Sequence, residues 1–215
     1  MTGVLELDHL TVVAPSLEQG VAHVRDCLGL DVPGGGTHPE MGTHNHLLRI
    51  GDDVYLEIIA VDPAAPPPAG PRWFGLGDLE AVRARWANGQ RLRGWVARTD
   101  DIDAVLRRHG ALLGGRTRVS RGGHFSNFSL RPDGEMPLGG VLPSVIERDG
   151  RSSPASGMPD LGARLCEFVL EHPEPAEIGA LFRRLGLRRA PVLRQGPEIR
   201  FSALIETPGG RRTLL

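Results

Sequence analysis

The sequence predicts an α+β protein built from tandem strand–helix–strand modules, with mostly antiparallel sheets and helices packed outside them. Three segments, residues 7–30, 93–114 and 165–187, share one plan: an apolar strand, a polar cap and an amphipathic helix that ends near glycine. The strands that follow the helices also repeat. The stretch FSNFSLRPDG at 125–134 matches FSALIETPGG at 201–210 at its Phe, Ser, Pro and Gly positions. Each module is therefore predicted to be one strand, one helix and three further strands.

The first module is assigned to residues 1–62. Ser16 and Gln19 form a capping box at the start of its helix. The apolar face of this helix consists of Leu17, Val21, Val24 and Leu28. A hairpin follows, in which THNHLLRIGDD leads into the apolar strand VYLEIIAV.

The later elements follow in the same way. Residues 63–90 form a Pro-rich connector with one short helix, because so many prolines exclude regular structure. Residues 91–150 form the second module, with a helix that begins behind an Asp-rich cap. Residues 151–160 form a linker rich in Ser, Pro and Gly. Residues 161–215 form a degenerate third module, with a helix beginning at Pro175 and a short last strand.

Composition limits the function classes. The chain has 215 residues, 40% hydrophobic and 24% charged, which is typical of a soluble globular protein. A net charge of −1 gives no electrostatic reason to expect nucleic acid or an anionic membrane as partner. No apolar stretch approaches the roughly 20 residues of a membrane span, and no secretory signal is visible. We therefore expect a cytoplasmic protein.

Two residue types exclude particular chemistries. Cys27 and Cys166 are the only cysteines, so neither a disulfide framework nor a Cys-rich zinc site is expected. All 25 basic residues are arginine, which excludes a lysine nucleophile or Schiff base.

Glu57 is the most informative residue, because it lies inside an apolar strand. An isolated buried carboxylate is costly, so Glu57 must be neutralised, hydrogen-bonded or bound to a metal. His9 shares a strand face with Leu7, Thr11 and Val13, while Asp8, Leu10 and Val12 are expected to point the other way. His9 is either a structural histidine or a ligand, and the residues alone leave both open.

The hairpin before Glu57 suggests a partner for it. A two-residue turn at Gly51-Asp52 places His46 directly opposite Glu57, within reach of a hydrogen bond or a shared metal. A shift of one residue would put Asn45 or Leu47 there instead. His46 and Glu57 therefore form either a self-contained buried pair or part of a site.

This arrangement, with His on the first strand and Glu on the last strand of a tandem module, resembles the vicinal oxygen chelate (glyoxalase/bleomycin-resistance/dioxygenase) superfamily. The strands GTHNHL and YLE look closest to its glyoxalase-like branch. The resemblance implies cupped sheets around a divalent metal (Fe, Mn, Ni or Zn), held by His9, Glu57 and Glu147. The fourth ligand position falls at Gly94, which has no side chain to offer. For Glu147, a solvated strand end is the alternative.

The resemblance leaves two functions open. One is a metal-dependent lyase, isomerase or dioxygenase acting on a small oxygen-rich metabolite, with Glu57 as the catalytic residue. The other is a metal-free protein that binds or sequesters a small molecule, as in bleomycin resistance. Asn45, His46 and His124 are expected around the ligand, with exposed loop histidines and backbone support as the alternatives. The third module is expected to cover the pocket or to support a homodimer.

Overall fold

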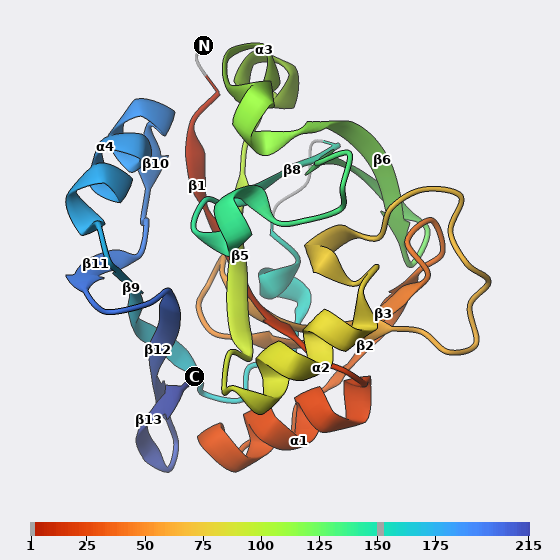
Figure 1. The fold of residues 1–215 in the computed structure, drawn as a ribbon. Helices are drawn as coiled ribbons and strands as arrows, with labels where there is room; N and C mark the ends of the chain where they lie inside the picture. Colours follow the sequence, from red (N-terminus) through yellow and green to blue (C-terminus); the bar gives the residue numbers. More distant parts are fainter. Residues whose placement is uncertain (1–2, 150–152) are drawn as a thin grey trace.

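The computed structural model describes residues 3–149 and 153–215 and confirms the predicted α+β class (Figure 1). The first two residues of the predicted 151–160 linker lie outside the described residues. The first strand–helix–three-strand unit consists of β1 (Leu5–Val13), α1 (Leu17–Leu28), β2 (Gly34–His38), β3 (Thr43–Arg49) and β4 (Tyr55–Val61). The connector then forms the short 3-10 helix η1 (Trp73–Gly75) and the helix α2 (Leu79–Ala87).

The second unit repeats this order with an insertion before its last strand. It consists of β5 (Leu92–Arg98), α3 (Ile102–Leu113), β6 (Gly115–Arg121), β7 (His124–Leu130), the 3-10 helix η2 (Pro137–Gly140) and β8 (Ser144–Arg148). The linker contains the 3-10 helix η3 (Pro154–Gly157). The third segment, residues 161–215, consists of β9 (Arg164–His172), α4 (Pro175–Leu185), β10 (Leu187–Arg188), β11 (Val192–Gln195), β12 (Arg200–Thr207) and β13 (Gly210–Leu214).

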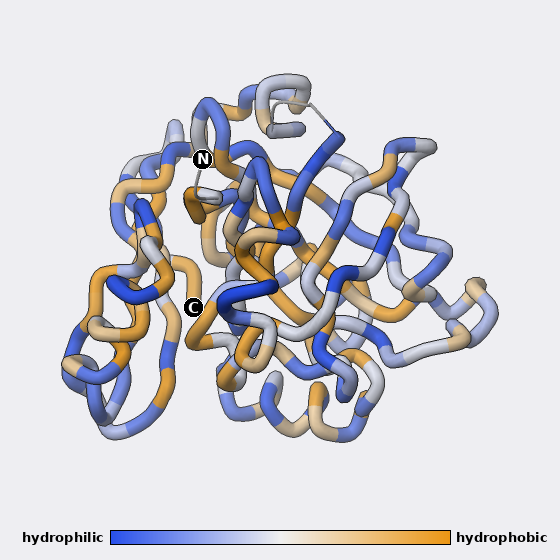
Figure 2. The backbone as a smooth tube through the Cα atoms, turned by 90° about the horizontal axis from the view of Figure 1, so that it is seen from above, coloured by the Kyte–Doolittle hydropathy of each residue, from blue (hydrophilic) through white to orange (hydrophobic). Residues whose placement is uncertain are grey.

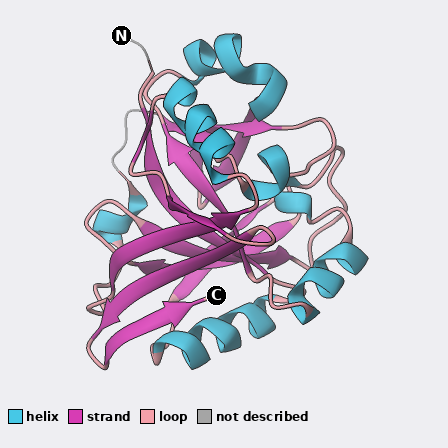
Figure 3. Ribbon diagram, turned by 60° about the vertical axis from the view of Figure 1, so that its left-hand side comes forward, coloured by secondary structure: helices cyan, strands magenta, loops and turns pink. Residues whose placement is uncertain are grey.

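The first two units join into one large sheet with the strand order β2-β3-β4-β1-β5-β8-β7-β6. In each unit the first strand pairs in parallel with the last, β1 with β4 and β5 with β8. The two first strands meet antiparallel at the centre of the sheet. The helix of each unit packs on one face of that unit's strands (Figure 3). The opposite face of the large sheet is not covered by these two helices, and it lines the cavity described below.

Local chemistry accounts for the helix ends. Ser16 Oγ accepts a hydrogen bond from Gln19 N, as the capping box requires, and Asp101 caps α3 in the same way. Gly29 ends α1 in the left-handed region at φ 69°, where a side chain would be strained.

The third segment departs from the plan of the first two. Its sheet has the order β11-β9-β12-β13, and β10 pairs with the beginning of β1 in the large sheet. It packs on the helix-covered face of the large sheet, where the Trp95 ring lies 6.1 Å from Phe168 and 5.9 Å from Phe182. None of its residues lines the cavity of the cup. Its position therefore does not agree with the expected role as a cover.

The buried apolar side chains of the described residues form three groups, and the two larger ones lie on opposite faces of the large sheet. In Figure 2 the backbone of many hydrophobic residues, in orange, runs through the middle of the fold. The larger group lies between the sheet, the helices and the third segment and includes Leu10, Leu56 and Trp95. The smaller group lies on the opposite face of the sheet, which we call the cup face, and includes Trp73, Phe74 and Phe128. No helix in the described part of the chain is long and apolar enough to cross a membrane.

Candidate functional site

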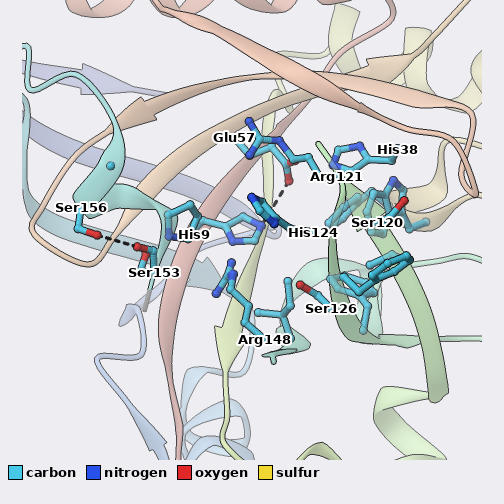
Figure 4. Close-up of a pocket in the computed structure, with 18 residues that line it drawn as sticks. His9, His38, Glu57, Ser120, Arg121, His124, Ser126, Arg148, Ser153 and Ser156 are labelled. Carbon is cyan, nitrogen blue, oxygen red and sulfur yellow. Dashed lines mark hydrogen bonds and ion pairs between the residues drawn. The ribbon is translucent and has the colours of Figure 1, made fainter. Parts of the chain in front are cut away.

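The cup face surrounds a cavity of about 550 Å³ (Figure 4). Both large-sheet units and the linker contribute to its wall. The lining residues are His9, His38, Glu57, Trp73, Phe74, Val119, Ser120, Arg121, His124, Phe125, Ser126, Phe128, Ile146, Arg148, Ser153, Pro154, Ser156 and Gly157. The linker helix η3, rather than the third module, thus closes one side of the cavity.

A line of charged side chains forms the floor of the cavity. His9 Nδ1 lies 2.6 Å from Asp8 Oδ1, and His9 Nε2 lies 3.3 Å from Glu57 Oε2. The second contact is an ion pair that is not aligned as a hydrogen bond, so His9 Nε2 has no well-aligned partner among the described residues. All three side chains are buried. The imidazole is therefore held between two carboxylates.

A β-bulge brings Asp8 and His9 to the same place. Leu7 pairs with Ala97 and His9 with Val96, so that Asp8 is an extra residue on β1. The bulge breaks the alternation of side chains, which is why Asp8 bonds to His9 instead of pointing the other way. The sequence-based expectation for Asp8 was wrong for this reason.

Glu57 is positioned by Asn45 and not by His46. Asn45 Nδ2 donates to Glu57 Oε1 at 2.6 Å, while Asn45 Oδ1 accepts from the backbone N–H of Gly36 at 2.9 Å. The residue directly opposite Glu57 is Leu47. Asn45 is buried and does not line the cavity, so it orients Glu57 and holds the backbone rather than touching a ligand.

His46 lies on the other face of the hairpin. Its Nδ1 lies 3.3 Å from the Val32 carbonyl oxygen, and the side chain faces α1. The predicted pairing of His46 with Glu57 is wrong because the loop between Ile50 and Val54 has three residues instead of two, which shifts the register by one.

Arg148 completes the floor of the cavity. Its Nη2 donates to Asp8 Oδ1 at 2.7 Å and to the Tyr55 hydroxyl at 3.1 Å. The Tyr55 ring stacks on His9 with centroids 4.5 Å apart. Sequence reasoning missed Arg148 because it assigned the cup face to the neighbouring Glu147.

Glu147 points away from the cup. Its Oε1 accepts from the backbone N–H of Ile102 at the start of α3, 3.1 Å away, and its Oε2 accepts from Asn127 Nδ2 at 2.8 Å. The alternation of β8 places Ile146 and Arg148 on the cavity side instead. Glu147 therefore does not join His9 and Glu57, and its carboxylate stabilises a helix N-terminus.

The electrostatics of the floor favour a fully charged network. Burial alone would raise the pKa of Glu57. The contact with His9 and the positive charge of His9, together with His38 and the hydrogen bond from Asn45, outweigh burial and lower this pKa to about 2. Burial opposes protonation of His9, yet the contacts with Asp8 and Glu57 raise its pKa above the ordinary value. Burial is likewise outweighed at Asp8, where His9 and Arg148 hold the pKa well below its usual range. Each of the three groups is therefore shifted toward its charged form, an imidazolium between two carboxylates.

One part of the wall is aromatic and consists of Trp73, Phe74, Phe125 and Phe128. Trp73 Nε1 donates to Thr43 Oγ1 at 3.2 Å, and Phe128 packs edge-on against Trp73 at 5.0 Å between centroids. His38 Nδ1 lies 3.2 Å from the same hydroxyl, and burial is the main cause that lowers the pKa of His38. His38 is thus a neutral polar group beside the charged floor.

Two residues at the β6–β7 hairpin add polar groups. His124 lines the cavity, as expected from its place in a Gly-rich loop. Arg121 Nε donates weakly to Asn45 Oδ1 at 3.4 Å, and its guanidinium makes no ion pair with the described residues. Arg121 and Arg148 therefore make this side of the cavity suited to a negatively charged ligand.

The donor set does not fit the resident metal that the resemblance implies. His9 and Glu57 are placed as two neighbouring ligands, with Asp8 orienting the imidazole as in many metal sites. Within residues 3–149 and 153–215, however, no group of three or more His, Cys, Asp or Glu side chains could hold a metal ion. At Gly94, the expected fourth position, the Met136 sulfur fills the space that a side chain would need, 2.6 Å from an ideal Cβ.

The tandem units and the His9–Glu57 pair of the cup fit the vicinal oxygen chelate superfamily, and a match to a family model assigns the chain to it. Within it, residues 7–186 match the family model described as glyoxalase-like domain, so the chain belongs to the glyoxalase-like domain family. No curated protein matches the chain.

Several solved structures are similar to the chain. A hypothetical protein from Staphylococcus aureus is 13% identical, with a TM-score of 0.64, covering 92% of this chain and 88% of its own. A variant of methylmalonyl-CoA epimerase from Streptomyces coelicolor is 19% identical, with a TM-score of 0.46, over 70% of this chain and 99% of its own. Methylmalonyl-CoA epimerase from Mycobacterium tuberculosis is 21% identical, with a TM-score of 0.40, over 66% of this chain and 87% of its own. The likeness to the S. aureus protein concerns the fold alone.

Proposed function

We propose that the protein is a lyase or isomerase that binds a small oxygen-rich anion in the cup and moves a proton with His9 and Glu57. The buried line Asp8–His9–Glu57, which ends in the cavity, is the observation that carries this proposal. Three charged groups in a buried place are not needed for stability, because well-packed apolar residues often serve as well. Charged groups at a cavity floor are typical of acid–base chemistry.

The chemistry assigned to each group follows from its charge. Glu57 takes a proton from a carbon next to a substrate carbonyl, and the electrons of that C–H bond move onto the carbonyl oxygen. The guanidinium groups of Arg121 and Arg148 stabilise the negative charge that forms there. A ligand that separates Glu57 from His9 removes the main cause of the low pKa of Glu57, which makes the carboxylate a stronger base. Return of the proton to another position completes an isomerisation.

A metal-free binding protein is the second candidate, and the aromatic wall favours it. Trp73, Phe74 and Phe128 offer an apolar surface, and His9 and Glu57 already neutralise each other. A metal-dependent lyase, isomerase or dioxygenase would need metal ligands beyond His9 and Glu57, and the described residues offer no third one beside them.

Solvent-deuterium exchange separates these functions without knowledge of the substrate. The protein, purified without a histidine tag, is incubated in D₂O with small oxo and hydroxy acids, and loss of C–H signals is followed by proton NMR. We expect the wild type to exchange at least one compound, and Glu57→Gln to slow this exchange by about 100-fold or more. The matched control Glu147→Gln changes a carboxylate that faces away from the cup and should exchange as the wild type does.

Two results would contradict the proposed metal-free proton transfer. Ligand binding without exchange in the wild type would support the binding protein instead. Elemental analysis adds a second readout: a stoichiometric metal that is lost in both His9→Ala and Glu57→Gln would contradict the metal-free proposal.

A further inference from the structure

A second cavity, of about 400 Å³, lies where α2 and β5 meet the third segment. It shares no lining residue with the cup. Its lining consists of Arg85, Gly89, Gln90, Arg91, Leu92, Arg93, Gly139, Glu171, Ile199, Arg200, Phe201, Ser202 and Leu215.

The lining is rich in arginines that lack an anionic partner. Arg85, Arg91 and Arg93 make no ion pair with any described residue, and each has one buried guanidinium nitrogen without a hydrogen-bond partner. Arg93 is 6% exposed, and neither it nor Arg85 makes a side-chain hydrogen bond within the described ranges. A buried cation of this kind is costly unless an anion is close, because it loses its hydration without compensation. Within residues 3–149 and 153–215, no carboxylate side chain lies within ion-pair distance of these three guanidinium groups.

The surroundings of the three arginines add to this imbalance. Burial, and then the charge of Arg85, lower the pKa of Arg93 to about 10, which shows that the two like charges act on each other. Arg91 Nη1 lies 3.3 Å from His23 Nδ1, and its guanidinium lies 5.3 Å from the Trp86 ring. Neither of these partners carries a negative charge.

The acidic groups nearby do not neutralise the three arginines. Arg200, also in the lining, is paired with Glu198 at 2.7 Å. Glu171 is the one acidic side chain in the lining, and it makes no ion pair with a described residue. Glu135 makes no ion pair with Arg93, and its negative charge raises the pKa of Arg93 only through a longer-range electrostatic interaction. Three positive charges therefore face the cavity with one unpaired carboxylate beside them.

We infer that this cavity is a binding site for a small organic oxyanion, in which a phosphate or carboxylate group lies among Arg85, Arg91 and Arg93. Guanidinium groups recognise both kinds of oxyanion through charge-assisted hydrogen bonds. Leu92, Ile199 and Phe201 supply apolar surface for the carbon part of such a ligand. The bound anion would bridge the second module and the third segment. This site is independent of the proposed function of the cup.

Isothermal titration calorimetry of the full chain with pyrophosphate, inorganic phosphate and citrate, at matched ionic strength, tests the inference. We expect one equivalent of at least one anion to bind, and Arg93→Met and Arg85→Met each to weaken it by 10-fold or more. The phosphate and citrate arms show which oxyanion is preferred. Arg116→Met is the matched control, because it also removes one positive charge, from an exposed residue paired with Asp103 on the second unit.

Folding of the variants is checked by circular dichroism and thermal unfolding. Because Arg93→Met removes a buried charge without a partner, the ligand-free variant should unfold at the same temperature as the wild type or higher. The inference is overturned if none of the three anions binds the wild type. It is equally overturned if Arg93→Met and Arg85→Met bind as tightly as Arg116→Met, since that result indicates diffuse charge attraction.

Discussion

Replacing Glu57 with Gln should lower the free energy of unfolding by roughly 3 kcal/mol at pH 7. The magnitude follows from the pKa of Glu57, which the folded protein lowers from 4.5 to about 2, at about 1.4 kcal/mol for each pKa unit. Because the folded pKa is below the unfolded one, this stabilisation is fully present above about pH 4.5. It is lost as the pH falls toward 2, so the wild type should lose stability in that range more steeply than the variant.

His9 has the opposite dependence on pH. Its folded pKa is raised above 6.5, so its contribution is present below that pH and lost as the pH rises through the folded pKa. Glu57→Gln weakens this contribution but leaves the contact between His9 and Asp8.

Urea unfolding followed by tryptophan fluorescence, at pH 9, 8, 7, 5, 4 and 3, measures both effects. Glu147→Gln is the control, and we expect it to cost about 1 kcal/mol, because its carboxylate accepts a bond from a helix N-terminus. The reasoning is refuted if Glu57→Gln lies within about 1 kcal/mol of the wild type at pH 7 and its stability falls in parallel with the wild type between pH 5 and 3.

Three further substitutions test the packing of the first hairpin, the contact with the third segment and the support of Glu57. Gly35→Ala places a Cβ 2.0 Å from the Asn45 carbonyl oxygen, so we expect a loss of about 1–3 kcal/mol in thermal unfolding; an unchanged melting temperature would contradict the close approach. Trp95→Ala should cost about 3–5 kcal/mol in urea unfolding and expose the third segment to proteolysis, because the ring is 1% exposed; a cost below about 1 kcal/mol would argue against this packing. Asn45→Ala removes a buried hydrogen bond to Glu57 and should cost about 1–3 kcal/mol at pH 7. Because the loss of this bond raises the folded pKa of Glu57 toward its unfolded value, the fall in stability below about pH 4.5 should be smaller than in the wild type, and an unchanged fall would show that Asn45 does not position the carboxylate.

The fold could be predicted from the sequence because its signals are local. The apolar periodicity of each helix, the cap at Ser16 and the repeated hairpins each depend on a few neighbouring residues. His9 and Glu57 could be assigned to a common hollow through the resemblance to the vicinal oxygen chelate superfamily, and the structure places His9 Nε2 3.3 Å from Glu57 Oε2.

The rest of the site depends on register, which the sequence does not determine to one residue. A bulge at Asp8 and a three-residue loop before Val54 each move side chains to the other face of a strand. The same one-residue uncertainty led to the prediction that Glu147 lies on the cup face, whereas the structure places Arg148 there. A buried Asp directly before His9 was a signal that could have been used, since a carboxylate in an apolar strand needs a partner as much as Glu57 does.

The two halves of the cup are chemically different although they share one plan of strands. The first unit supplies Glu57 with the imidazoles of His9 and His38, whereas the second supplies the guanidinium groups of Arg121 and Arg148, His124 and the apolar side chains Phe128 and Ile146. In a dimer of identical single units, every substitution would occur twice, and such a division of labour could not arise. Because both units are covalently joined in one chain, each can change independently, so that one half of the cavity can carry the carboxylate and the other the cationic and apolar wall.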